Sequence, residues 1–182
     1  MRNIFLAAVA TASLLAGTPS LAQTLTPTDV GVSPLTGMSG TDYVKLAADS
    51  DNFEIQSGRI AEMKSKRKDV RAFAKQMITD HTGTTKSLMA ALNNQDRKIT
   101  PPSTMLSSDN QAKIALLRKA PKNSFDQIYL QQQLQAHQAA WALQKGYATD
   151  GTDASLKQVA TTAVPVVESH ISMLKGMTSG AM

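Results

Sequence analysis

Residues 69–94 read DVRAFAKQMITDHTGTTKSLMAALNN. The apolar residues of this stretch recur every three or four positions, and this spacing puts them on one face of an α-helix. The residues on that face are Val70, Phe73, Ala74, Met77, His81, Thr84, Leu88 and Ala91. Because a long amphipathic helix must bury its apolar face against other elements, the stretch predicts one member of a helix bundle.

Three further segments have the same helical periodicity. They cover residues 41–65, 124–148 and 154–177. A shorter helix is predicted over residues 109–119, inside the long connection in the middle of the chain. Four helices of about 25 residues each predict an all-α protein with a ferritin-like four-helix bundle and a short extra helix in the middle connection.

Two places interrupt these patterns. Ser50, Asp51 and Asn52 lie inside the first predicted helix, although such residues favour helix ends over helix interiors, so a hinge is expected there. Pro165 lies inside the last predicted helix and is expected to kink it, because proline lacks the backbone donor and clashes with the preceding turn.

The charge of the chain argues against nucleic acid as a partner. The formal net charge is +5, and the densest run of cations comprises Lys64, Lys66, Arg67 and Lys68. A nucleic-acid site would combine such a run with stacking aromatic residues or a recognition helix, and neither pattern is present. Since the run follows the predicted end of the first helix, it is better explained by the favourable interaction of cations with that end.

The N-terminus has the pattern of a secretory signal peptide. Arg2 precedes an apolar run over residues 4–16, and small residues before residue 23 predict cleavage after Ala22. The predicted organisation is a signal peptide over 1–22, a flexible linker over 23–40, the bundle over 41–178 and a tail over 179–182. We therefore expect a periplasmic protein that has no transmembrane segment once the signal is removed. The chain contains no cysteine, which excludes a lipoprotein anchor and disulfides.

The three histidines are the residues most suited to chemistry. His81, His137 and His170 each lie near the middle of a different predicted helix, on its inner face. The middles of antiparallel helices share one level, so the three rings are expected to converge, with Glu54 of the first helix beside them. Imidazoles and a carboxylate suit a divalent ion such as zinc, iron or copper. The alternative is that the histidines are neutral and hydrogen-bonded to buried polar partners.

Three further residues are candidates for orienting the rings or pairing with them. They are Asp80, Glu168 and Tyr129. A di-iron centre is not favoured, because it requires Glu-x-x-His motifs, whereas Ile78 and Val167 precede His81 and His170 by three positions. Thiol nucleophiles, a glycine-rich phosphate loop and a nucleophile elbow are also missing from the sequence. The catalytic class therefore stays undetermined, and a role other than catalysis is favoured.

The sequence resembles a bacterial domain-of-unknown-function family, number 4142, whose members are exported, ferritin-like helical proteins often labelled as predicted outer-membrane proteins. The resemblance covers residues 42–174 and depends on Asn52-Phe53-Glu54-Ile55, Gly58, Ala61, Val70, Phe73-Ala74, Met77, Asp80-His81-Thr82, Phe125-Asp126, Tyr129, Ala136-His137, Val164-Pro165 and His170. It implies a ferritin-like bundle in the periplasm. It also implies that Glu54, Asp80 and the three histidines are polar core positions of the family. The chain departs from the family pattern at Gln131, Gln132 and Gln133, where a more apolar segment is usual.

Three functional hypotheses follow from these observations. The first is a periplasmic bundle without enzymatic activity that binds a small ligand, a metal or a protein partner, in a binding or envelope-stress role. The second is a metal-sequestering or redox protein that uses His81, His137, His170 and Glu54. The third is a purely structural bundle with a buried histidine network. Whether the bundle forms oligomers is not determined by the sequence.

Overall fold

The computed structural model describes residues 24–93 and 99–179, so the predicted signal peptide lies outside the described residues. Within these ranges every regular element is a helix, which confirms the all-α prediction. The elements are α1 (Pro27–Val30), α2 (Gly40–Lys64), α3 (Lys68–Leu92), α4 (Ser108–Lys119), α5 (Phe125–Asp150) and α6 (Ala154–Ser179). None of the helices in the described part of the chain is both long enough and apolar enough to cross a membrane.

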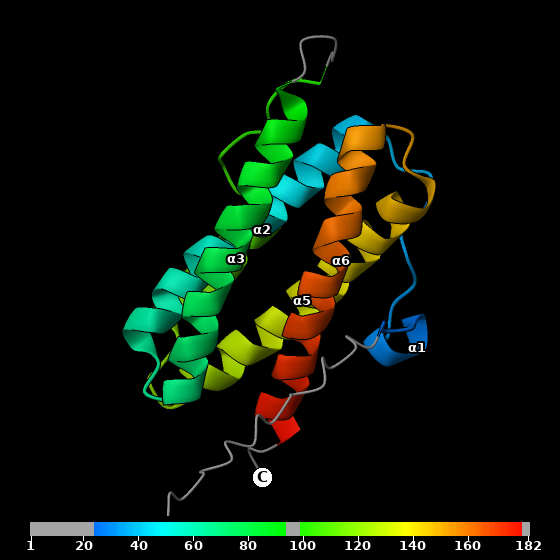
Figure 1. Ribbon diagram of the computed structural model, residues 1–182. Coiled ribbons are helices and arrows are strands. Elements are labelled where there is room, and N and C mark those ends of the chain that lie inside the picture. Colours follow the sequence, from blue (N-terminus) through cyan, green and yellow to red (C-terminus); the bar gives the residue numbers. More distant parts are fainter. Residues whose placement is uncertain (1–23, 94–98, 180–182) are drawn as a thin grey trace, which may run out of the picture.

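The four long helices form two hairpins packed side by side (Figure 1). Residues 65–67 join α2 to α3, and residues 151–153 join α5 to α6. Around the bundle α2 packs against α3 and α5, while α6 packs against α5 and α3, with neighbours running in opposite directions. The connection from α3 to α5 returns along the bundle and carries α4, which packs against α2 and α5. The predicted extra helix is therefore present, and the likeness to ferritins stays a prediction.

Polar side chains set the beginnings of the helices. The hydroxyl oxygen of Ser39 accepts the backbone N–H of Asp42, and Ser107 caps α4 in the same way. The carboxylate of Asp153 accepts the N–H groups of Ser155 and Leu156 at 3.0 Å each. These bonds satisfy donors that have no partner inside the helix. At the other ends, the observed limits fall within a few residues of those predicted from the periodicity.

Neither of the two expected interruptions breaks its helix. α2 runs through residues 50–52, and α6 runs through Pro165 to Ser179. Asp51 is tolerated inside α2 because it is buried and its carboxylate accepts hydrogen bonds from side chains of α3. The polar residue thus serves a contact between helices rather than a hinge.

The core has an apolar region at each end of the bundle. One region contains Phe53, Phe73, Leu117 and Phe125 among its buried residues. The other contains Tyr43, Val44, Leu88, Tyr147 and Leu156, and in it the rings of Tyr43 and Tyr147 stack with centroids 4.1 Å apart. Along α3 and α5, His81 and His137 fall between these two regions. The histidines therefore form a polar layer between the two apolar regions.

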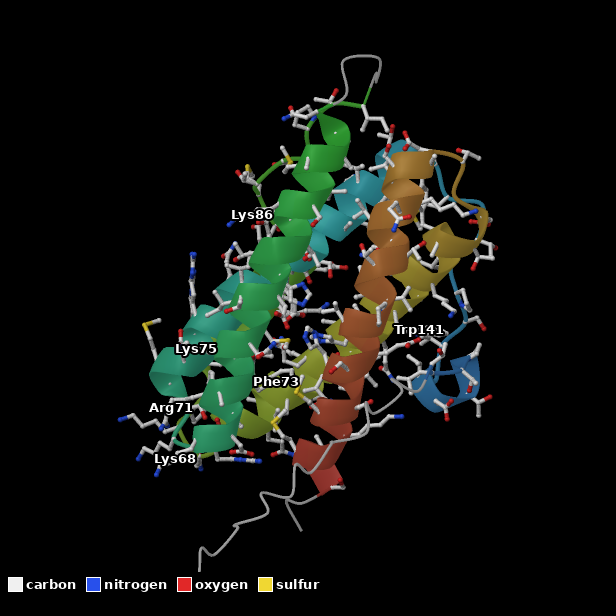
Figure 2. All side chains as sticks on the ribbon, in the orientation of Figure 1. Lys68, Arg71, Phe73, Lys75, Lys86 and Trp141 are labelled. Carbon is white, nitrogen blue, oxygen red and sulfur yellow. The ribbon has the colours of Figure 1, made fainter. Side chains whose placement is uncertain are left out.

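The segment predicted to be a flexible linker is instead packed on the bundle. We call residues 24–39 the N-terminal strap. Its helix α1 places Val30 in a buried apolar group with Trp141 and Ile171, and Figure 2 shows Trp141 on the side of the bundle that faces α1. Further along, Leu35 donates its N–H to the carbonyl oxygen of Ala142 at 2.9 Å. Part of this attachment is made by backbone groups, which leave no periodic pattern in the sequence.

Gly146 allows the strap to lie close to α5, and its replacement tests this contact. A Cβ atom at position 146 would lie 1.7 Å from the carbonyl oxygen of Leu35. We expect Gly146→Ala to displace the strap, so that the amide hydrogen of Leu35 exchanges faster in hydrogen-exchange measurements. Gly83→Ala is the control, because a Cβ there meets no atom within 4 Å and alanine in a helix is favoured by about 0.5–1 kcal/mol. A Leu35 amide that stays protected in Gly146→Ala would contradict the contact.

Candidate metal centre

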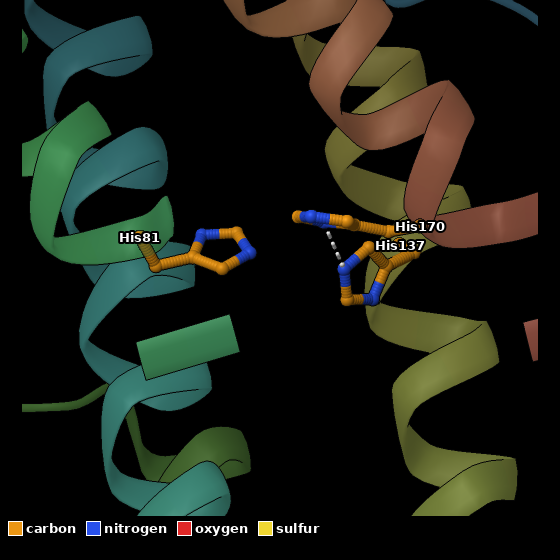
Figure 3. Close-up of side chains that lie close together, drawn as sticks. All are labelled: His81, His137 and His170. Atoms are coloured by element: carbon orange, nitrogen blue, oxygen red, sulfur yellow. Dashed lines mark hydrogen bonds between the residues drawn. The ribbon is translucent and has the colours of Figure 1, made fainter. Parts of the chain in front are cut away.

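The structure brings the three histidines together in the middle of the bundle. His81 comes from α3, His137 from α5 and His170 from α6, and all three are buried. One ring nitrogen from each lies within 4.8 Å of the other two. Figure 3 shows the ring of His81 pointing from one hairpin toward the rings of His137 and His170 on the other. We call these three residues the histidine cluster.

In each ring one nitrogen faces an oxygen atom at hydrogen-bonding distance. The pairs are His81 Nδ1 with Asp51 Oδ1 at 2.8 Å, His137 Nδ1 with the backbone oxygen of Gln133 at 2.8 Å, and His170 Nε2 with Asp80 Oδ2 at 2.9 Å. Carbonyl and carboxylate oxygens accept hydrogen bonds and do not donate them. The ring nitrogen must therefore carry the proton in all three pairs, and we call these the outer nitrogens.

The remaining nitrogens, which we call the inner nitrogens, face one another. Nε2 of His137 lies 3.2 Å from Nδ1 of His170, and Nε2 of His81 is buried without a hydrogen-bond partner. A neutral imidazole has a single N–H, and the outer nitrogens already carry it. The 3.2 Å contact therefore joins two lone pairs, unless a cation lies between them. That cation is either an additional proton or a metal ion.

Burial disfavours the additional proton. It lowers the pKa of His137 well below the usual value, and it lowers the pKa of His170 to about 4, against the opposing effect of the hydrogen bond with Asp80. The third ring of the histidine cluster, His81, has its pKa shifted in the opposite direction. Burial acts to lower the pKa of His81 as well, but the hydrogen bond with Asp51 and the charges of nearby carboxylates outweigh it and raise that pKa.

Asp51 is the functional residue that the sequence reasoning missed. Its carboxylate is buried and, besides His81, accepts the hydroxyl groups of Thr84 at 2.8 Å and Thr85 at 3.1 Å. Three donors from α3 thus fix the carboxylate in place. A signal was present, because Asp51 is an acidic residue on the predicted inner face of the first helix, one turn before Glu54. The backbone oxygen of Gln133 has no such signal in the sequence.

Glu54 lies beside the cluster but not among the converging atoms. Its Oε1 is 3.8 Å from Nδ1 of His137, which is an outer nitrogen. Neither carboxylate oxygen of Glu54 has a hydrogen-bond partner, and the residue is 1% exposed. Burial raises the pKa of Glu54 to about 7. Glu54 is therefore placed to supply negative charge close to the cluster rather than to complete the set of inner nitrogens.

The other three candidates have different positions. Asp80 contacts His170, as described above. Glu168 instead accepts the indole N–H of Trp141 at 3.0 Å. The hydroxyl group of Tyr129 is buried without a hydrogen-bond partner and makes no bond to a histidine. The structure thus gives a ring-orienting contact to Asp80 and none to Glu168 or Tyr129.

The buried carboxyl group of Glu54 predicts a pH-dependent gain in stability when it is removed. The folded pKa is raised from 4.5 to about 7, so the folded protein binds the proton more tightly and loses stability as the pH rises through this window. We expect Glu54→Gln to match the parent near pH 4.5 and to exceed it by about 2–3 kcal/mol above pH 7. Urea unfolding of the metal-free protein between pH 4.5 and 8 measures this difference.

Glu62→Gln is the matched control, because Glu62 lies on the same helix and is exposed. It should leave the pH dependence of the unfolding free energy unchanged. If Glu54→Gln gives the same profile as the parent at all pH values, the carboxyl group of Glu54 is not buried in the way described.

Comparison with known protein families gives a match that covers the residues of this site. The model of a family described as "Domain of unknown function (DUF4142)" matches residues 26–177, a range that includes α1 to α5, most of α6 and the whole histidine cluster. No curated protein and no solved structure matches the chain. Because the match covers most of the sequence, the chain belongs to the domain-of-unknown-function family DUF4142.

Proposed function

We propose that this protein binds one divalent transition-metal ion through His81, His137 and His170. The observation that carries the proposal is the direction of the ring nitrogens. Each outer nitrogen donates to an oxygen atom, and the inner nitrogens of all three rings face the same small region of the core.

The donor set fits such an ion. Neutral imidazole is a common ligand for zinc, copper, iron and nickel. Histidine ligands of metals usually donate their second N–H to a carboxylate or a backbone carbonyl, as all three rings do here. In the absence of an ion, the outer partners hold the rings with their inner nitrogens toward one another.

The spacing of the inner nitrogens supports the same interpretation. Two imidazole nitrogens bound to one zinc ion at about 2.0–2.1 Å in tetrahedral geometry lie about 3.3 Å apart. The corresponding distance between His137 and His170 is 3.2 Å. The ring of His81 lies farther away, within the 4.8 Å that bounds the cluster, and would approach the other two on binding.

The charge around the cluster favours a cation. Asp51 and Asp80 are each hydrogen-bonded to a ring, and Glu54 lies next to His137. These carboxylates offset the charge of a divalent ion, whose burial would otherwise carry a large desolvation penalty. Without an ion, neither carboxylate oxygen of Glu54 has a hydrogen-bond partner.

The second candidate function is a structural histidine network, and the 3.2 Å contact between His137 and His170 is the observation that favours it. In that case a shared proton takes the place of the metal. Burial opposes this arrangement, because it lowers the pKa of both rings. Metal binding is therefore the better supported function, and it is a specific form of the binding role that the sequence suggests. The signal-like residues 1–22 support a periplasmic location as part of the same proposal.

Titration with cobalt, which reports its coordination through visible absorption, tests the metal site. The mature protein, prepared without a histidine tag and without metal, should bind one equivalent of Co²⁺, and Zn²⁺ should displace it. His81→Ala removes one ligand and should abolish binding. Lys86→Ala, an exposed residue on the same helix, should bind as the parent does. Absence of binding by the parent, or unchanged binding by His81→Ala together with lost stability of about 1–3 kcal/mol, would favour the structural network.

The orienting role of Asp51 makes a second prediction. Asp51→Asn removes the charge that holds the N–H of His81, and such outer partners typically contribute 10–100-fold to metal affinity. We expect the affinity for Zn²⁺ to fall by about this factor while the stoichiometry stays at one. Asp49→Asn, two positions away with its carboxylate bonded to Ser107 and Asn110, should leave the affinity unchanged. Equal affinities for the parent and Asp51→Asn would refute the orienting role.

A further inference from the structure

Three of the four seams between the long helices are covered or closely packed. At the seam between α2 and α3, a Cβ atom on Gly58 would lie 2.9 Å from the side chain of Ile78, so the two helices are already close. The N-terminal strap covers the seam between α5 and α6, with Val30 packed against Trp141 and Val167. Helix α4 packs on both α2 and α5, and the remaining groove on that seam is small, at about 190 Å³.

The seam between α3 and α6 is open by comparison and carries neighbouring grooves of about 310, 550 and 270 Å³. We call the first of these the α3–α6 groove. It is lined by Gln76, Asp80, Pro165, Val166, Ser169, His170 and Met173. The groove therefore reaches a member of the histidine cluster from the surface.

Asp80 lies between solvent and the histidine cluster in this groove. Its side chain is 24% exposed, whereas the side chain of His170, to which it is hydrogen-bonded, is 2% exposed. Gln76 holds the same carboxylate oxygen through its amide at 2.7 Å. A cation that approaches along the groove meets the carboxylate of Asp80 first and then the Nε2–H of His170, so this ring must turn before its Nδ1 can bind the ion.

We propose that the metal ion enters and leaves through the α3–α6 groove, with Asp80 as its first contact and His170 as the ligand that turns to receive it. This inference rests on the proposed metal binding and adds how the bound ion exchanges with the surroundings. The ion exchanges with the surroundings through one defined opening, as in sequestration or transfer, instead of being locked in during folding. Neither His137 nor His81 lines the groove, so both bind after His170.

The local structure of α6 is consistent with movement at this place. Pro165 lines the groove and precedes His170 by five positions. A proline inside a helix leaves the carbonyl four positions earlier without its usual backbone donor, which weakens the helix on that turn. The weakened turn covers residues 161–165 and ends five positions before the ligand that the route requires to move.

Obstruction of the groove tests the route. Ser169 is exposed and lines the groove, so Ser169→Phe places a large ring at the opening. We expect the rate of Co²⁺ uptake in stopped-flow absorption, and the rate of Co²⁺ loss to excess chelator, to fall at least tenfold each. The affinity should change little, because both rates fall together. Ala139→Phe is the matched control, since Ala139 is exposed and lines the groove between α2 and α5.

The outcomes separate the route from the metal site itself. If the parent binds no Co²⁺, the proposed function fails. If the parent binds but Ser169→Phe exchanges the ion at the rates of the parent, or Ala139→Phe slows exchange equally, the route is wrong and the metal site stands. If Ser169→Phe does not fold, Met173→Trp obstructs the same groove from another exposed position and is subject to the same two outcomes.

Discussion

The central constraint in this molecule is the position of three protons. Each buried imidazole has one N–H when neutral, and in each ring the outer nitrogen donates this N–H to an oxygen atom. The inner nitrogens of His137 and His170 thereby face each other with their lone pairs, at 3.2 Å in a buried core. Burial keeps the rings of His137 and His170 from taking up further protons. A cation at this point satisfies the lone pairs, and that is why the cluster is better explained as a binding site than as core filling.

The rest of the fold serves to hold this layer at one level. Two antiparallel hairpins bring the middles of α3, α5 and α6 together. Apolar regions at both ends of the bundle stabilise the fold and offset the free-energy cost of burying the polar layer. α2 contributes the carboxylate of Asp51, which is held by Thr84 and Thr85 as well as by His81. The strap and α4 cover two seams of the bundle, so the cluster meets the surface at the side where Asp80 is exposed.

Much of this arrangement could be predicted from the sequence, and the reasons for the misses are physical. The 3.6-residue periodicity defines the four long helices and places each histidine on an inner face, so their convergence follows from helix geometry. Periodicity does not resolve which of two acids one turn apart points at a ring, so Glu54 was favoured over Asp51. The carbonyl of Gln133 could not be found, since a backbone oxygen has no residue signature. The strap was missed because α1 has only four residues, too few for a pattern, although Thr26 and Asp29 form a capping box.

Nitrogen-15 NMR of the imidazole groups at neutral pH measures the protonation of each ring nitrogen. The chain has three histidines, so the spectrum of the metal-free protein contains few signals to assign. We expect all three outer nitrogens to be protonated, Nδ1 in His81 and His137 and Nε2 in His170, and the inner nitrogens of His137 and His170 to carry no proton. His81, whose pKa is raised, gives up any proton on its inner nitrogen when the metal binds. One equivalent of Zn²⁺ should then shift all three inner nitrogens together. Protonated inner nitrogens in His137 or His170 that do not respond to Zn²⁺ would contradict the account and show that a proton occupies the centre of the bundle.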